Sequence, residues 1–194
     1  MTRQQFDARP SDSELMLVAS ENGEAFAGLF DRHSRAVFGY AAQRLGAQAA
    51  EDVVGETFLV AFQRRDRFDP AFGDVRPWLL GIATNLISRR RRTEAAHYRA
   101  LLRFPHEVQG EEQAERVSAR VSAAALRPQL AEALAGLPGR DRDVLLLIVW
   151  AELSYEQTAL ALDIPIGTVR SRLNRARRKV RAALGDTDPL NEQE

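Results

Sequence analysis

The apolar residues of this chain recur at the spacing of an α-helix, and this regularity limits the fold more than any other feature. Between Phe26 and Leu45 they return every three or four positions, and the same spacing continues through most later segments. The two-residue alternation of a half-buried β-strand is never sustained, and even the β-branched residues fall at helical spacing. The pattern therefore predicts an all-α fold.

Turn and cap signals divide the first half into three expected helices. The apolar stripe over 26–45 ends at Gly46, a residue suited to stop a helix. Acidic residues open a second helix over 51–65, where they complement the positive helix N-terminus. A loop that contains Pro70 follows, and Pro77 suits the first turn of a third helix, which ends in four arginines.

Beyond residue 103 the apolar pattern weakens, and it returns only near residue 129. Proline, glycine and glutamate occur in between, so we interpret this stretch as an acidic, flexible linker between two small helical domains. In the second domain, helices are expected over 129–135, 139–150, 155–162 and 167–184. The expected organisation is a flexible tail (1–14), an N-terminal domain (15–103), the linker (104–128), a C-terminal domain (129–185) and a second tail (186–194).

Composition argues against several classes of site. The chain has no cysteine and its three histidines lie far apart, so neither disulfides nor a metal site is expected. No nucleophile with a neighbouring base emerges, and adjacent acids such as Glu51 and Asp52 are explained as helix-start charges, so we expect neither an enzyme nor a cofactor. The longest apolar run, Val144 to Ala151, is too short to cross a bilayer, and the N-terminus lacks an apolar signal segment. We expect a cytoplasmic protein without membrane insertion.

The formal net charge is zero, yet the basic residues are concentrated in two blocks. Six arginines and one acid lie between Asn85 and Arg103. Between Ile164 and Leu184 there are six arginines and one lysine, with no acid. Two basic blocks separated by an acidic stretch suggest two contacts with DNA. Solvated helix ends are the alternative explanation of either block alone.

The strongest local signal lies between Leu153 and Leu184. Ser154 is placed to cap a short helix that starts at Tyr155, and a break over 163–165 separates it from a long helix. This is the spacing of a helix-turn-helix, which lays its second helix in the major groove of duplex DNA.

The long helix of this motif has one narrow apolar sector, which must pack on its domain. No acid interrupts the remaining surface, whereas an ordinary solvated helix would mix acids among the bases. Outward residues are therefore expected to reach base edges, and flanking cations to reach phosphates. The apolar sector contains Val169, Leu173, Ala176 and Val180. The candidates for duplex DNA are Thr168, then Ser171, Asn174, Arg175 and Arg178 in the outward sector, and Arg170, Arg172, Arg177 and Lys179 on the flanks.

The helix expected over 51–65 is apolar around most of its circumference. Its narrow polar stripe contains Asp52, Glu56 and Gln63, with Leu59 beside it. Acids on so apolar a helix favour a protein partner with basic residues. A central core helix with one wet edge explains the same pattern equally well.

Three aromatic residues, Phe68, Phe72 and Trp78, lie in or beside the loop that precedes the basic third helix. Aromatic rings next to cations are typical of surfaces on which single-stranded bases stack. Trp78 shares a helical stripe with Ile82 and Leu86, which favours a core position for its ring.

Three segments resemble the extracytoplasmic-function sigma factors of bacterial RNA polymerase. LSYEQTALALDIPIGTVRSRLNRARRKV (153–180) resembles the second DNA-binding region of that family. AEDVVGETFLVAF (50–62) resembles its core-polymerase-binding helix, and RPWLLGIATNLISRRRR (76–92) resembles the helix that meets the minus-ten element. These segments follow the family's order and belong to both expected domains.

The resemblance implies a sigma factor that binds core RNA polymerase and directs initiation at specific promoters. The stripe of Asp52, Glu56, Leu59 and Gln63 would grip the clamp helices of the largest polymerase subunit, and the C-terminal helix would read the minus-thirty-five element as duplex. The family also leads us to expect an anti-sigma protein as a partner. The residues implied at the opened, single-stranded minus-ten element are Arg67, Phe68, Phe72, Arg76, Asn85, Arg89, Arg90, Arg91 and Arg92.

An ordinary regulator is the main alternative, with its helix-turn-helix on an operator and its first domain dimerising or sensing a ligand. It accounts for the C-terminal motif but leaves the arginine run and the aromatic loop unexplained. Co-purification with core polymerase distinguishes the two functions.

Overall fold

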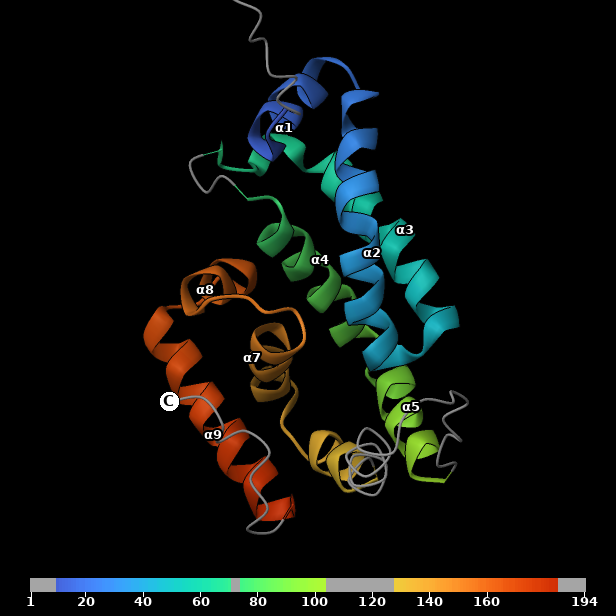
Figure 1. The fold of residues 1–194 in the computed structure, drawn as a ribbon, viewed down its shortest axis with the longest axis vertical. Helices are drawn as coiled ribbons and strands as arrows, with labels where there is room; N and C mark the ends of the chain where they lie inside the picture. Colours follow the sequence, from blue (N-terminus) through green and yellow to red (C-terminus); the bar gives the residue numbers. More distant parts are fainter. Residues whose placement is uncertain (1–9, 71–73, 104–127, 185–194) are drawn as a thin grey trace, which may run out of the picture.

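The computed structural model of the protein describes residues 10–70, 74–103 and 128–184, and all regular secondary structure in these ranges is helical (Figure 1). This confirms the expected all-α fold. The acidic segment interpreted as a linker lies outside the described residues except at position 128, as do most of the two expected tails.

The N-terminal half is built around a long central hairpin of helices. In this hairpin α2 packs along α3, and α4 then packs against both. Leu29, Val53 and Leu80 are fully buried where these helices meet, because apolar residues at helical spacing line their facing sides. The helices of this half are α1 (Asp12–Glu21), α2 (Ala25–Leu45), α3 (Ala47–Gln63), α4 (Arg76–Arg89) and α5 (Arg91–Arg103), with a 3-10 turn at Arg65–Arg67.

Three helix boundaries in this half differ from the sequence expectation, and one is the start of α3 at Ala47, four residues before the expected start at residue 51. A helix, α1, begins at Asp12, inside the expected tail, because Ser11 caps it and the Glu14 carboxylate accepts a hydrogen bond from the Ser11 backbone N–H. The third expected helix ends at Arg89, and Arg90 turns the chain into α5. The arginine run therefore spans a joint between two helices.

The C-terminal half consists of a helix over 128–135 followed by α7 (Gly139–Val149), α8 (Tyr155–Leu162) and α9 (Ile166–Leu184). These bounds agree with the expected helices to within one residue. α7 and α8 both pack on α9, whose apolar sector closes the small core.

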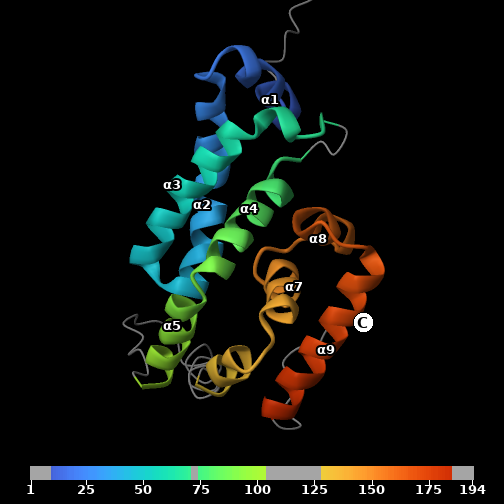
Figure 2. The ribbon, with the colours of Figure 1, turned by 180° about the vertical axis from the view of Figure 1, so that it is seen from behind.

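The two halves pack directly against each other. α4 lies against α8 and touches α7, so the helix expected to meet the minus-ten element faces the helix-turn-helix (Figures 1 and 2). Buried apolar residues of both halves form one continuous core. This arrangement could not be predicted, because local periodicity indicates only that a helix has an apolar face and not what covers it.

Candidate DNA and polymerase interfaces

The helix-turn-helix is held by the cap that the sequence indicates. The Ser154 side chain accepts a hydrogen bond from the backbone N–H of Gln157, and the Gln157 side chain accepts one from the Ser154 N–H. Asp163 then ends α8 in the left-handed conformation, with φ at 51°. The cap and the left-handed residue together set the sharp change of chain direction between α8 and α9.

α9 presents the two faces that the sequence predicts. Its apolar residues are buried, with Val169 and Ala176 completely enclosed. Ser171, Asn174 and Arg178 are exposed on the other side. Among the remaining duplex candidates, Arg170, Arg175 and Lys179 are also exposed, while Thr168, Arg172 and Arg177 are half-buried at the flanks.

One outward residue of α9 has a partner from another helix. Arg175 donates from Nε to Asp141 Oδ2 at 3.3 Å and from Nη2 to Asp141 Oδ1 at 3.0 Å. Asp141 lies in the first turn of α7, and its side chain is only 7% exposed. Sequence analysis missed Asp141 because a contact across 34 positions leaves no local signal.

Some of the minus-ten candidates are exposed in the structure, and others contact residues of the protein. Asn85 and Arg89 are exposed on α4, and Arg67 is exposed on the 3-10 turn. Arg76 instead donates from Nη2 to the Ala151 carbonyl of the C-terminal half at 2.8 Å. Arg92 is exposed on α5, whereas Phe72 and the side chain of Arg91 lie outside the described residues.

The expectation that Phe68 presents its ring for base stacking requires correction. The residue is 8% exposed, and its ring packs on Trp78 with centroids 5.6 Å apart. Burial of an aromatic surface outweighs its exposure on a loop, so the chain after the 3-10 turn folds back onto α4. In this arrangement Phe68 offers no face to a base, and Trp78 belongs beside the core, as its stripe with Ile82 and Leu86 indicated.

The polar stripe of α3 lies on the surface as expected. Asp52 and Gln63 are exposed, and Leu59 is 56% exposed. Beside it, an open groove of about 400 Å³ runs between α2 and α3 and is lined by Phe30, Phe38 and Val54 among others. An apolar groove next to acids is suited to a protein partner with a mixed apolar and basic surface.

Arg90, a minus-ten candidate, lies against this stripe. Its Nη2 donates to Glu56 Oε2 at 2.9 Å, and its Nη1 lies 4.0 Å from Asp52 Oδ2. All three side chains are partly exposed, so the pairs are weak and exchangeable. The structure thus brings one candidate for DNA together with two candidates for polymerase.

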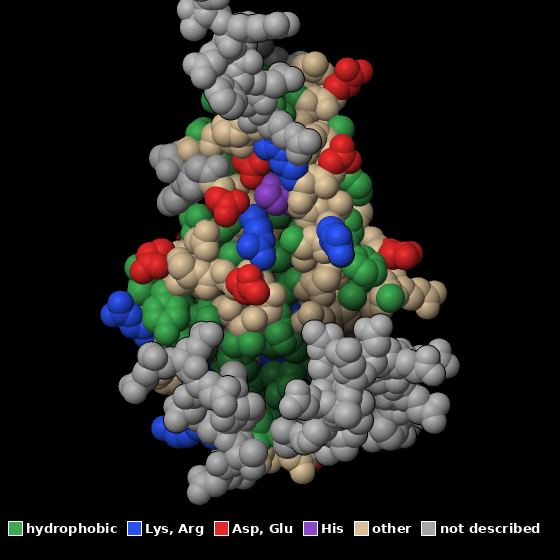
Figure 3. All heavy atoms as spheres, viewed as in Figure 1, with side chains coloured by type: hydrophobic (Ala, Val, Ile, Leu, Met, Phe, Trp, Pro, Cys, Tyr) green, Lys and Arg blue, Asp and Glu red, His purple; other side chains and the backbone are tan. Residues whose placement is uncertain are grey.

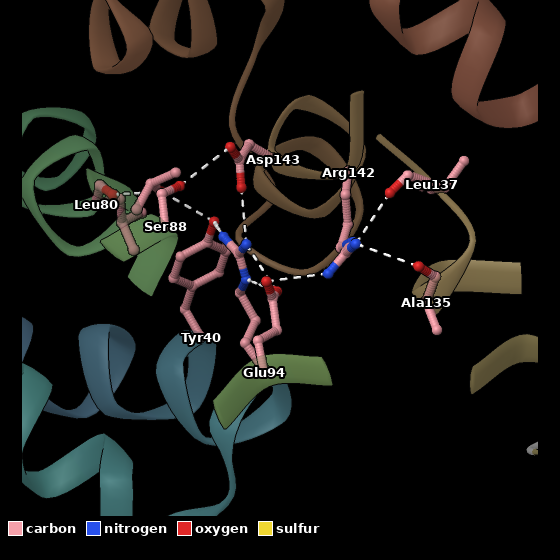
Figure 4. Close-up of polar contacts among 10 residues, drawn as sticks. Tyr40, Leu80, Ser88, Glu94, Ala135, Leu137, Arg142 and Asp143 are labelled. Carbon is pink, nitrogen blue, oxygen red and sulfur yellow. Dashed lines mark hydrogen bonds and ion pairs between the residues drawn. The ribbon is translucent and has the colours of Figure 1, made fainter. Parts of the chain in front are cut away.

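A buried charge cluster of four residues joins the two halves (Figure 4). Arg44 is 1% exposed, and its Nη2 pairs with Glu94 of its own half and with Asp143 of the other, both at 2.7 Å. Glu94 pairs in turn with Arg142 of the C-terminal half at 3.0 Å. The cluster therefore makes two ion pairs across the interface, Arg44 with Asp143 and Glu94 with Arg142.

The charges of this cluster are tolerated in the interior only when their partners are present. Burial alone would lower the pKa of the Arg44 guanidinium, but Tyr40, Asp143 and Glu94 outweigh that effect and raise the pKa above its ordinary value. Burial also raises the pKa of the Asp143 carboxyl, although Arg44 opposes this. Each charge is thus costly to bury and is tolerated only beside its partners.

Beside the cluster, the interface includes apolar contacts, a close backbone approach and a few polar bonds. A Cβ built at Gly81 of α4 would overlap the backbone carbonyl of Ala161 in α8, so only glycine permits this approach. Gln157 donates to Asp74 at 3.4 Å across the same seam. The approach covers the side of α4 that carries Gly81, while Asn85 stays exposed at its edge.

The C-terminal half also has an apolar groove of about 200 Å³, which sequence analysis did not anticipate. Apolar side chains line a hollow on the face that bears α7 and α9 (Figure 3). Leu134, Leu146, Trp150 and Leu184 contribute to it.

Two kinds of feature are absent from the described ranges. No helix there combines the length and apolar character needed to cross a membrane. Within the same part of the chain, no group of three or more histidine and acidic side chains has the geometry to hold a metal ion.

Family models match the two halves separately. The model of Sigma-70 region 2 matches residues 29–97, and the model of Sigma-70, region 4 matches residues 127–180. The first span contains the α3 stripe and α4, and the second contains the helix-turn-helix. α4, the candidate DNA-binding residues of α9 and the polymerase candidates therefore lie inside the matched spans.

Whole-chain relatives agree with these models. The ECF RNA polymerase sigma factor SigL of Mycobacterium tuberculosis is 34% identical over 168 residues, covering 86% of this chain and 93% of SigL. CnrH, solved in complex with the cytosolic domain of CnrY, superposes with a TM-score of 0.61 at 28% identity, over 92% of this chain and 100% of CnrH.

The fold is further supported by the sigma factor RpoE of Bartonella quintana, solved with the anti-sigma factor NepR. It superposes with a TM-score of 0.57 at 23% identity, over 85% of this chain and 99% of RpoE. With both sigma-70 regions present in this order and SigL similar over nearly its whole length, the chain belongs to the extracytoplasmic-function sigma factors, and it binds core RNA polymerase to direct initiation at specific promoters.

Proposed function

We propose that the two halves divide promoter recognition, with the N-terminal domain (15–103) on polymerase and the minus-ten element and the C-terminal domain (129–185) on the minus-thirty-five element. The observation that carries this division is the surface of α9. Its exposed side is free of acids, and its flanks carry half-buried arginines that can reach phosphates. Arg175 is the proposed base-reading residue, and Arg177 the proposed phosphate contact.

For the minus-ten element we retain the exposed side chains of α4, the 3-10 turn and α5. Asn85 is the candidate for a flipped base because it is the exposed amide on α4. Arg67, Arg89 and Arg92 are exposed and suit the phosphates of a single strand. Phe68 is withdrawn from the stacking role because its ring is in the core.

For polymerase we propose the α3 stripe together with the groove beside it. Glu56 and Asp52 are partly neutralised by Arg90, so a basic partner must displace Arg90 to reach them. Displacement would release Arg90 toward DNA at the moment when polymerase binds. The exposed Leu59 supplies apolar contact in the same interface.

The packed arrangement of the halves cannot serve both promoter elements at once. α4 packs on α8 and α8 on α9, and packed helices lie about 10 Å apart, which puts α4 about 20 Å from α9. The two elements are about 25 base pairs apart, or about 85 Å of duplex at about 3.4 Å per base pair. We therefore propose that this structure is a closed form and that the halves separate on the promoter.

A protein of this family acts where polymerase acts, so we propose a cytoplasmic location and no enzymatic activity of its own. The sigma factor RpoE was solved with the anti-sigma factor NepR. By analogy we propose an anti-sigma partner for this chain, with the apolar groove of the C-terminal half as one contact for an apolar helix.

Transcription with purified core polymerase tests the residue roles. We expect Asn85→Ala to reduce transcription from a duplex promoter and to change little the affinity of the holoenzyme for a duplex fragment that carries only the minus-thirty-five element. Arg175→Ala should weaken binding to that fragment. If both variants impair the same step on both templates, the proposed division between the halves is wrong.

A further inference from the structure

We infer that Asp141 is a positioning residue that orients Arg175 for base recognition and suppresses its contacts with phosphates. The inference rests on the proposed role of Arg175 as a base-reading side chain.

The geometry leaves one edge of the Arg175 guanidinium available. Asp141 accepts from Nε and Nη2, the two nitrogens along the side of the guanidinium plane, at 3.3 and 3.0 Å. The end of the plane, formed by Nη1 and the second N–H of Nη2, keeps two donors. Two parallel donors match O6 and N7 of guanine, so an arginine held in this way can still make the bidentate contact that identifies guanine.

The Asp141 side chain is more restricted than that of Arg175, so Asp141 positions Arg175 and not the reverse. The Asp141 side chain is 7% exposed, whereas that of Arg175 is 49% exposed. The Asp141 N–H bonds to the Pro138 carbonyl at 2.9 Å in the first turn of α7, and α7 packs on α9. An acid is also favourable at a helix N-terminus. Asp141 is thus the fixed member, and it restrains the rotamers of a long arginine that would otherwise lose that freedom on binding DNA.

Charge adds a second effect. The carboxylate next to Arg175 offsets its positive charge, and the hydrogen bond to Asp141 raises the pKa of Arg175 above its ordinary value. A neutralised arginine attracts phosphates less, and phosphate attraction is the part of binding that ignores sequence. Asp141 should therefore lower non-specific binding while it raises discrimination at one base pair.

The test uses the full-length chain assembled with core polymerase. Equilibrium competition measures binding to the preferred minus-thirty-five sequence and to single-base variants of it, over a range of salt concentrations. For Asp141→Ala we expect discrimination at the Arg175 base pair to fall about tenfold, within the range of one bidentate contact. Binding to scrambled DNA should become tighter, with a salt slope steeper by about one.

Control variants separate this inference from a structural effect and from the proposed function. Arg140→Ala changes the exposed neighbour of Asp141 and should leave discrimination at the Arg175 base pair unchanged. The double variant Asp141→Ala with Arg175→Ala should discriminate no worse than Arg175→Ala alone. A misfolded C-terminal half would weaken every DNA and lower helix content, which circular dichroism detects.

The outcomes distinguish two failures. If Arg175→Ala leaves discrimination intact, Arg175 does not read a base and its proposed function is wrong. If Arg175→Ala abolishes discrimination at one base pair while Asp141→Ala preserves it and leaves scrambled DNA unaffected, the positioning role of Asp141 is overturned and the role of Arg175 stands.

Discussion

The two helices that we propose to contact DNA are presented in opposite ways. α9 exposes its polar side and buries only a narrow apolar sector, so its reading surface is accessible. α4 is covered along one side by α8, and Arg76 at its start is bound to the C-terminal half. The proposed surface for duplex DNA is therefore accessible in this structure, whereas the proposed surface for single-stranded DNA is partly covered.

The contacts that hold each helix explain which one can be released. The buried sector of α9 is wholly apolar, and water cannot replace its contacts. The seam between the halves combines apolar contacts with ion pairs and hydrogen bonds, such as Arg76 with Ala151 and Arg44 with Asp143. Water and polymerase can offer substitutes for polar contacts, so the seam between the halves is the part that can open.

The largest effect is expected from the buried charge cluster. Arg44→Met removes the cation that faces Glu94 and Asp143 and leaves Asp143 buried without its counter-charge. Unfolding in urea, followed by circular dichroism, should show a loss of about 3–5 kcal/mol. Arg178→Ala, on the exposed side of α9, is the matched control and should change stability by less than about 0.5 kcal/mol. If the two changes lower the free energy of unfolding equally, the buried cluster contributes no more to stability than an exposed arginine does.

A glycine pair tests the seam itself. Gly81→Ala places a methyl group against the Ala161 carbonyl and should weaken the contact between halves by about 1–3 kcal/mol, the range for overpacking. Gly39→Ala in α2 meets no atom within 4 Å and should instead stabilise its helix by up to about 1 kcal/mol. Small-angle scattering should show a larger radius of gyration for Gly81→Ala alone. Unchanged dimensions for both variants would contradict the close approach of α4 and α8.

The α3 stripe gives a smaller, polymerase-dependent effect. Reversing Asp52 and Glu56 to arginine should weaken association with core polymerase about tenfold, which corresponds to about 1.4 kcal/mol. Arg90→Ala exposes the same acids and should leave that affinity unchanged or raise it. A pull-down titration measures both, and circular dichroism checks the fold. Normal affinity of the reversed variant would remove the stripe from the polymerase interface.

The smallest effect is expected at the cap of α8. Ser154→Ala removes the acceptor for the Gln157 N–H and should lower the stability of the C-terminal half by about 1 kcal/mol. Ser171→Ala, on the exposed side of α9, should lower stability less, because the Ser171 hydroxyl donates only to the Thr168 carbonyl within its own helix. Thermal melts of the two variants compare them directly. A larger loss for Ser171→Ala would show that the cap does not hold α8.

What the sequence predicted well is what local chemistry decides. The start of α8 at Tyr155, its end near Asp163 and the two faces of α9 follow from a cap, a turn and a period, all within a few residues. The family could also be recognised from the sequence, because its motifs lie within short segments of this kind.

What the sequence could not predict depends on residues far apart. The burial of Phe68 needs Trp78 beneath it, Asp141 needs Arg175 from a later helix, and Arg44 needs Asp143 across 99 positions. The start of α1 is a different case, because the Ser11 and Glu14 box was present and was outweighed by the polar composition around it.

The central claim is that the halves are packed together in the free protein and separate on the promoter. The chain has no cysteine, so single cysteines at exposed Ala96 in α5 and Ala182 in α9 allow a unique donor and acceptor pair to be attached. We predict high energy transfer in the free protein and a fall to background in the holoenzyme on promoter DNA. The same transfer efficiency in both states, in a sample that is active in transcription, would contradict the account.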